Sequence, residues 1–211
     1  MDIIMLIVFL VVYGLNLYFI ATENKYGYFI TKLLLTPTLY HFYASKNDNP
    51  MLTVFFALLF SFFGDLFMEF SKEEAFFTAG LGSFLIGHIF YILSFYSQIN
   101  KFAVPRYLLI FLLAYIGYGI YIYRILNVQD RKLSIPVILY CGAILLMSFL
   151  ALLRMKSVST VSFILTYIGS LLFIASDSIL AYNKFNKKVR HSGLWIMSTY
   201  GFAQLLIVAG L

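Results

Sequence analysis

A few ionisable side chains interrupt long apolar stretches of this sequence. They are Lys32, Asp65, Glu69, His88 and Asp177. In lipid, such a side chain costs at least about 2.5–3.5 kcal/mol at the middle of a helix, so it persists where function or bracing requires it. Carboxylic acids and a histidine can donate and accept protons, which indicates acid–base chemistry or proton transport.

The two aspartates repeat the same spacing. From Asp65 to His88 is 23 residues, and from Asp177 to Tyr200 is also 23. Each aspartate lies about five residues before the end of an apolar segment, and Lys32 lies about five residues after the start of another. We therefore expect all three at a similar depth, in one polar chamber that opens toward one membrane face.

Softer polar residues accompany these charges and are the expected supporting groups. His88 and Tyr91 are one helical turn apart, as are Tyr200 and Gln204, so each pair would share a helix face. The supporting candidates, beside His88 as a catalytic candidate, are Lys32, Tyr91, Asn183, Tyr200 and Gln204.

Structural roles compete with these functional ones. Asp65 could brace helix packing by pairing with Lys32, and His88 could simply hydrogen-bond a neighbouring helix. Glu69 lies close to the end of its segment, so we expect it to be solvated. Two aspartates at equal depth with a histidine nearby favour function over bracing.

The composition indicates an integral membrane protein with one domain over residues 1–211. Of its 211 residues, 62% are hydrophobic and only 11% are charged, against about 25% charged in soluble domains. A soluble domain of this size could not bury so much apolar surface, and a disordered chain would be far more polar. The net charge of +6 belongs to short loops, so it does not indicate nucleic-acid binding.

Eight apolar segments are long enough to cross a bilayer as helices, which need roughly 20 residues each. They cover about 3–21, 28–44, 51–69, 76–97, 106–126, 134–153, 160–182 and 192–210. They are too long and too evenly apolar for barrel strands, so we expect an all-α, multi-pass bundle. The offset of 112 residues between the two aspartates suggests two four-helix halves of the same orientation.

The loops after the first, third, fifth and seventh segments carry more basic residues than the other loops. The positive-inside rule then puts those loops in the cytosol and both termini outside. The one cysteine, Cys141, lies inside an apolar run, and the three histidines are far apart. We therefore expect neither a metal site nor a disulfide.

Four short motifs resemble the YhhN-like lysoplasmalogenase family. They are Phe60 to Asp65 (FSFFGD), Gly87 to Tyr91 (GHIFY), Ser176 to Phe185 (SDSILAYNKF) and Ile196 to Gln204 (IMSTYGFAQ). The motifs occur in order along nearly the whole chain, and the count of eight segments agrees with that family. Together they make a fairly specific resemblance.

The resemblance implies an enzyme that hydrolyses the vinyl ether of lysoplasmalogens. The products would be a fatty aldehyde and glycerophospho-ethanolamine or -choline, with no metal or organic cofactor. It implies the endoplasmic reticulum membrane in an animal, or the inner membrane in a bacterium. It also implies that Asp65 and Asp177 are the catalytic pair.

A vinyl ether resists base but is cleaved by acid, which suits two carboxyl groups. One protonates the β-carbon, and the other stabilises the oxocarbenium ion and activates water, much as in glycoside hydrolysis. We assign Asp65 as the acid and Asp177 as the stabiliser, although the sequence leaves the order open. His88 and Tyr91 would orient water, and Lys32 would hold the substrate phosphate or adjust Asp65.

Three other functions remain open on the sequence. A small proton or cation transporter also uses intramembrane Asp, His and Lys, but it needs access from both faces. A lipid-binding or scaffold protein would not need either aspartate. A different lipid hydrolase is also possible, although the absence of a GxSxG motif argues against a serine enzyme.

Overall fold

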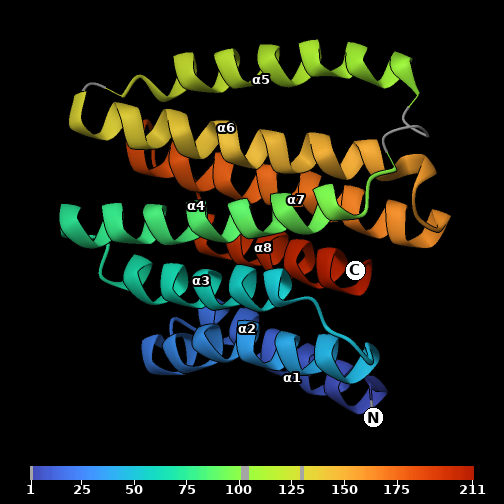
Figure 1. The fold of residues 1–211 in the computed structure, drawn as a ribbon. Coiled ribbons are helices and arrows are strands. Elements are labelled where there is room, and N and C mark those ends of the chain that lie inside the picture. The colour runs from blue at the N-terminus through green and yellow to red at the C-terminus, as the bar shows by residue number, and fades with distance from the viewer. Residues whose placement is uncertain (1, 101–104, 129–130) are drawn as a thin grey trace. The chain divides into compact units, whose positions relative to one another are not determined.

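The structure is a computed structural model that describes residues 2–100, 105–128 and 131–211. Every regular element in these ranges is helical (Figure 1), which confirms the all-α expectation. The elements are α1 (Asp2–Ala21), α2 (Lys25–Lys46), α3 (Leu52–Glu69), α4 (Glu74–Ser97), η2 (Arg106–Ile110), α5 (Phe111–Leu126), α6 (Arg131–Leu153), η3 (Arg154–Lys156), α7 (Thr160–Phe185) and α8 (Ser192–Ala209).

Seven of the described helices are long and apolar enough to cross a membrane. The chain is therefore an integral, multi-pass membrane protein, as its composition predicts. The helix that falls short is α2, whose apolar residues are interrupted by Lys32, Pro37 and His41. An eighth span through α2 stays a prediction.

Side-chain caps fix where two of the helices begin. The Asn24 side chain accepts a hydrogen bond from Gly27 N at 3.0 Å and starts α2. The Ser159 hydroxyl accepts one from Ser162 N at 3.2 Å and starts α7. Each cap satisfies a backbone N–H that has no partner inside its helix.

The chain divides into two compact units, residues 1–90 and 91–211. The division falls inside α4, between Phe90 and Tyr91, rather than in the connection that follows this helix. The expected relation between two four-helix halves, and the assignment of one domain, both stay predictions.

In the first unit, α1 packs on α2 and α2 packs on α3. Small residues let α3 and α4 approach closely, because a Cβ added to Gly87 would lie 3.1 Å from the Ala57 carbonyl oxygen. Phe56 and Phe60 of α3 also stack on Phe90 of α4. Glycine at such a contact is typical of helix pairs in membranes.

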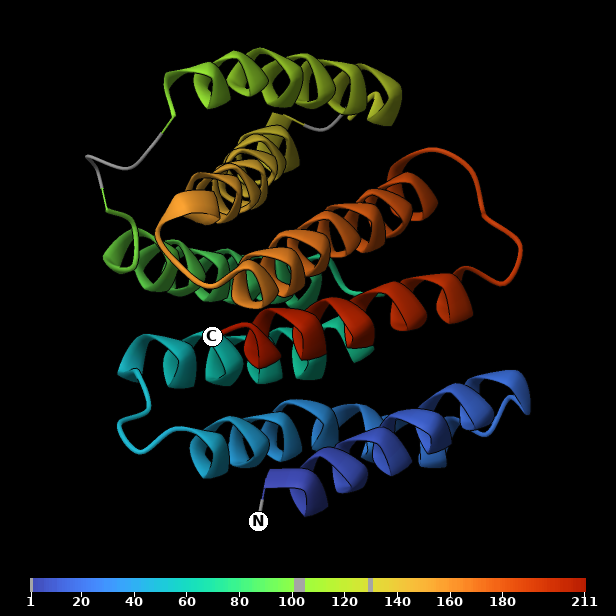
Figure 2. The ribbon, with the colours of Figure 1, turned by 90° about the vertical axis from the view of Figure 1, so that its right-hand side faces the viewer.

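In the second unit, α7 and α8 run antiparallel and pack along their length (Figure 2). A Cβ on Gly169 would lie 2.9 Å from the Ala203 carbonyl oxygen, so this backbone approach needs glycine. The other side of α7 packs against α6. This arrangement holds the residues around Asp177 between three helices.

The helix α5 is much less enclosed than the helices that it contacts. Of residues 106–126, only Leu108 and Leu126 are buried, and they lie near opposite ends of that range. Leu108 joins a small apolar cluster with Phe149 and Leu152 of α6. The middle of α5 is therefore left open.

Candidate active site

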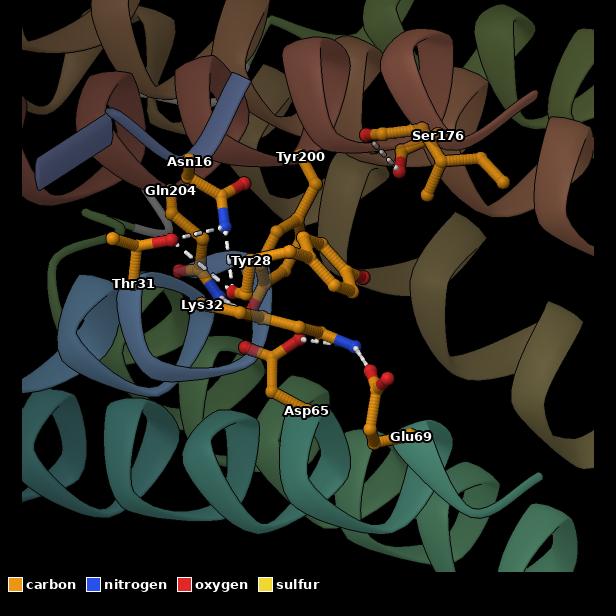
Figure 3. A network of polar contacts seen from close by, with 10 residues as sticks. Asn16, Tyr28, Thr31, Lys32, Asp65, Glu69, Ser176, Tyr200 and Gln204 are labelled. Atoms are coloured by element: carbon orange, nitrogen blue, oxygen red, sulfur yellow. Dashed lines mark hydrogen bonds and ion pairs between the residues drawn. The ribbon is translucent and has the colours of Figure 1, made fainter. Parts of the chain in front are cut away.

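In the first unit, one lysine lies between two carboxylates (Figure 3). The Lys32 Nζ is 3.9 Å from Asp65 Oδ1 and 3.8 Å from Glu69 Oε2. The same ammonium lies 5.5 Å from the centre of the Tyr28 ring. Lys32 and Asp65 are 6% and 3% exposed, so this is a buried ion pair between α2 and α3.

Helical spacing explains this cluster. Asp65 and Glu69 are one turn apart on α3, so both carboxylates point from one helix face toward Lys32. The pairing of Lys32 with Asp65 confirms the bracing contact considered from the sequence. Glu69, which was expected to be solvated, is partly exposed, at 29% of its side chain, and also pairs with the same lysine.

A buried asparagine ties α1 to α2 beside this cluster. The Asn16 side-chain amide donates to Thr31 Oγ1 at 3.0 Å and to the Tyr28 carbonyl at 3.2 Å. Thr31 precedes Lys32 and Tyr28 lies one turn before it on α2. These bonds therefore fix the helix turn that carries the lysine.

In the second unit, the Asp177 carboxylate accepts a hydrogen bond on Oδ2 from the Tyr140 hydroxyl. Tyr140 comes from α6, is 7% exposed, and was not anticipated from the sequence. Asp177 lies eight residues before Phe185, the last residue of α7. Asp65 lies four residues before Glu69, the last residue of α3, so the equal spacing to the helix ends does not hold.

Three of the predicted supporting residues do come together in the second unit. The Tyr91 hydroxyl donates to Gln204 Oε1 at 2.6 Å, and Gln204 Nε2 donates to the Tyr200 hydroxyl at 3.4 Å. All three side chains are buried. The one-turn spacing of Tyr200 and Gln204 therefore places both on the inner face of α8, as predicted.

Two other predicted residues have different surroundings. The Asn183 side-chain oxygen accepts a hydrogen bond from Val189 N at 3.0 Å, which shapes the loop between α7 and α8. His88 lies on α4 and is 1% exposed. The Ser176 hydroxyl donates to the Ile196 carbonyl at 3.1 Å and thereby ties α7 to α8 just before Asp177.

One arginine is far more buried than its position in the sequence indicates. Arg154 directly follows an apolar run and is 0% exposed. Its guanidinium donates to Gln98, Thr166 and Ser162 and lies 5.0 Å from a phenylalanine ring of α4. These bonds join the ends of several helices. Its position directly after an apolar run was the one available indication of burial.

Among the residues that the structure describes, no three His, Cys, Asp or Glu side chains form a group that could hold a metal ion. The groups available for chemistry are carboxyl, phenol, amide, imidazole and ammonium. Such groups can move a proton, orient water and stabilise a cation or an anion.

Comparisons with known proteins identify the family of the chain. A model of the YhhN family matches residues 27–211. A curated human (Homo sapiens) protein named lysoplasmalogenase TMEM86B is 31% identical over 132 residues. That match covers 62% of this chain and 52% of the relative, so the chain spans about half of that protein's length. No solved structure matches the chain.

Proposed function

Because the chain belongs to the YhhN family, we propose that it is a membrane lysoplasmalogenase. It would hydrolyse the vinyl ether of lysoplasmenyl-ethanolamine or -choline to a fatty aldehyde and glycerophospho-ethanolamine or -choline. The observation that carries the proposal is a buried carboxylate, Asp65, inside an apolar helix of a chain similar to a protein named lysoplasmalogenase.

The chemistry that we propose uses two carboxyl groups and one water molecule. A carboxylic acid gives its proton to the β-carbon of the vinyl ether, and the π electrons form the new C–H bond. The resulting oxocarbenium ion is attacked at the α-carbon by water, which loses a proton to a carboxylate. The hemiacetal hydroxyl then loses its proton to a carboxylate while the bond to the glycerol oxygen breaks, and that oxygen takes a proton from the carboxylic acid, which yields aldehyde and alcohol.

The surroundings of the two aspartates favour the reverse of the roles assigned from the sequence. The Lys32 ammonium compensates the charge of Asp65, which suits Asp65 to stay a carboxylate and stabilise the oxocarbenium ion. Asp177 is then the group left to deliver the proton, and the Tyr140 hydroxyl would orient its carboxyl group. The proposal requires both carboxyl groups to reach one substrate.

The supporting residues act through position. His88 would orient the attacking water, and the bonded group of Tyr91, Tyr200 and Gln204 would keep the wall of the site rigid. Lys32 would act on Asp65 rather than on the substrate phosphate, because two carboxylates already share it. We expect the endoplasmic reticulum membrane in an animal, or the inner membrane in a bacterium.

Purified protein incubated with lysoplasmenyl-ethanolamine and with an ester-linked lysolipid of equal chain length tests the reaction class. Aldehyde from the vinyl ether, with no fatty acid from the ester, is the expected result. Fatty acid release from the ester would replace the proposal with a different lipid hydrolase. Proton flux in vesicles without any aldehyde would replace it with a transporter.

A further inference from the structure

A wide apolar groove runs between α5 and α6, both in the second unit. Its volume is about 580 Å³, within the range of small-molecule sites, roughly 300–1,000 Å³. The residues that line it are almost all apolar, with an arginine at one end. They are Leu112, Tyr115, Ile116, Gly119, Ile120, Tyr123, Arg124, Ile138, Cys141, Gly142, Leu145, Leu146 and Phe149.

The groove is about as long as the hydrocarbon part of one bilayer leaflet is deep. On α5 its lining extends from Leu112 to Arg124, which is roughly 18 Å of helix at 1.5 Å per residue. Half of the hydrocarbon core of a bilayer, the depth that one lipid chain fills, is roughly 15 Å. On α6 the groove is kept open at Gly142, where an added Cβ would meet no atom within 4 Å.

The charge at one end of the groove suits an anionic headgroup. Arg124 lies in the last turn of α5, is exposed, and makes no hydrogen bond or ion pair with any described residue. The side-chain amide of Asn186, just after α7, donates to the Ile125 carbonyl at 2.9 Å. The C-terminal ends of α5 and α7 therefore lie at the same depth. Arg124 therefore lies where a helix ends and a lipid phosphate would be found.

Asp177 does not line the groove itself, but it is bonded to the groove helix α6 and lies deeper than Arg124. Tyr140, which donates to Asp177, directly precedes Cys141 in the groove lining. Measured from the bond between Asn186 and Ile125, Asp177 is nine residues along α7, or roughly 13 Å. In a lysoplasmalogen the vinyl ether follows the phosphate by a glycerol unit, so a phosphate at Arg124 brings the reacting carbons toward the depth of Asp177.

We propose that the groove between α5 and α6 binds the single hydrocarbon chain of a lysophospholipid, with Arg124 on its phosphate. This assignment rests on the proposed function and adds to it the place and the orientation of the substrate. The lipid lies along the groove from its phosphate at Arg124, past the level of Asp177, toward Leu112 and Phe149. The groove opens sideways, where Ile116, Ile120 and Leu146 are each about half exposed, so the lipid enters from the bilayer.

Photolabelling tests binding without requiring hydrolysis. The probe is a lysophosphocholine with a saturated 1-O-alkyl chain that carries a diazirine near its end, added to the full chain in lipid nanodiscs. We expect labelled peptides from 112–124 and 138–149, and competition by an unlabelled saturated ether lysolipid. Equal competition by a two-chain phospholipid would overturn the proposal, because the groove would then hold ordinary bilayer lipid.

Two matched variants, one that fills the groove and one that does not, test whether the probe binds there. Gly142→Phe puts a ring into the groove, and we expect about a tenfold loss of labelling, or about 1.4 kcal/mol. Gly117→Phe adds the same ring to open space on α5 outside the groove lining, and its labelling should match the wild type. Equal labelling of both variants would overturn the proposal.

Activity then separates this proposal from the proposed function. If the wild type releases aldehyde, Gly142→Phe should lose activity on long-chain substrates more than on short ones, and Arg124→Gln should raise KM with little change in kcat. Groove labelling without any aldehyde would support the binding site and reject the lysoplasmalogenase. Aldehyde release with all labelling outside α5 and α6 would reject the groove and keep the enzyme.

Discussion

Asp65 and Asp177 differ in the kind of group that compensates their charge. Asp65 shares an ammonium with Glu69, whereas Asp177 accepts a hydrogen bond from a phenol. Removing a cation from buried carboxylates leaves uncompensated charge, while removing a hydroxyl costs one hydrogen bond. Substitutions of the two partners should therefore have effects of different size.

Replacing Lys32 should damage folding as well as activity. We expect Lys32→Met to lower the free energy of unfolding by about 3–5 kcal/mol, because two carboxylates then lack a cation. Lys32→Arg should recover most of the stability. Thermal unfolding in detergent measures both, with Lys25→Met at the exposed start of α2 as the control. An unchanged Tm for Lys32→Met would show that the ion pairs of Lys32 contribute nothing to the stability of the fold.

Tyr140→Phe should slow the reaction while leaving the fold intact. Its hydroxyl orients Asp177, so we expect kcat for aldehyde release to fall about tenfold, or about 1.4 kcal/mol. Tyr118→Phe is the matched control, because its hydroxyl bonds Ser178, the neighbour of Asp177, at 2.8 Å. Equal kcat values for the two variants would remove Tyr140 from the mechanism.

The sequence predicts the contact between Lys32 and Asp65 but not the contact between Tyr140 and Asp177. Lys32 and Asp65 are rare opposite charges at similar depth in apolar segments, so their pairing can be expected. Tyr140 is one of 17 tyrosines, and its role arises only where α6 packs on α7. Arg154 was missed for a related reason, because the turn η3 directs it back among α4 and α7.

At the scale of elements, apolar runs predict the helices well and their ends less well. Each of the eight expected segments overlaps a described helix. The seventh extends to Phe185 because Tyr182, Asn183 and Lys184 continue the helix beyond the apolar run. The first turns of the fifth form the 3-10 helix η2, which local hydrophobicity does not distinguish from an α-helix.

Close contact between α7 and α8 provides a test at this scale. Gly169→Ala places a methyl group 2.9 Å from the Ala203 carbonyl oxygen, and the helices must separate. We expect a loss of about 1–3 kcal/mol in the free energy of unfolding. Gly14→Ala in α1 meets nothing within 4 Å and should not lower stability. If Gly169→Ala were as stable as the wild type, α7 and α8 would be farther apart at this position than the structure shows.

At the scale of the whole molecule, the sequence predicts a membrane protein from composition alone. Its prediction of eight spans depends on α2, where one lysine, one proline and one histidine reduce the apolar character. The loops on the two sides of α2 lie on opposite membrane faces only if this helix crosses the bilayer.

Single cysteines in a Cys141→Ser background test that crossing. We expect Asp48→Cys to react with an impermeant maleimide added outside right-side-out vesicles, and Thr22→Cys to react only after permeabilisation. Charge asymmetry predicts this orientation, and the reverse labelling would invert it while keeping the span. Labelling of both positions from one side would contradict eight spans.

The most direct measurement of the central claim is aldehyde release by wild type, Asp65→Asn and Asp177→Asn, each purified and folded in the same detergent. Both substitutions keep the shape of the side chain and remove its acid. We predict that each lowers aldehyde release from a lysoplasmalogen by about a hundredfold or more. Wild-type activity in either variant would contradict the claim that two intramembrane aspartates carry the proton transfer.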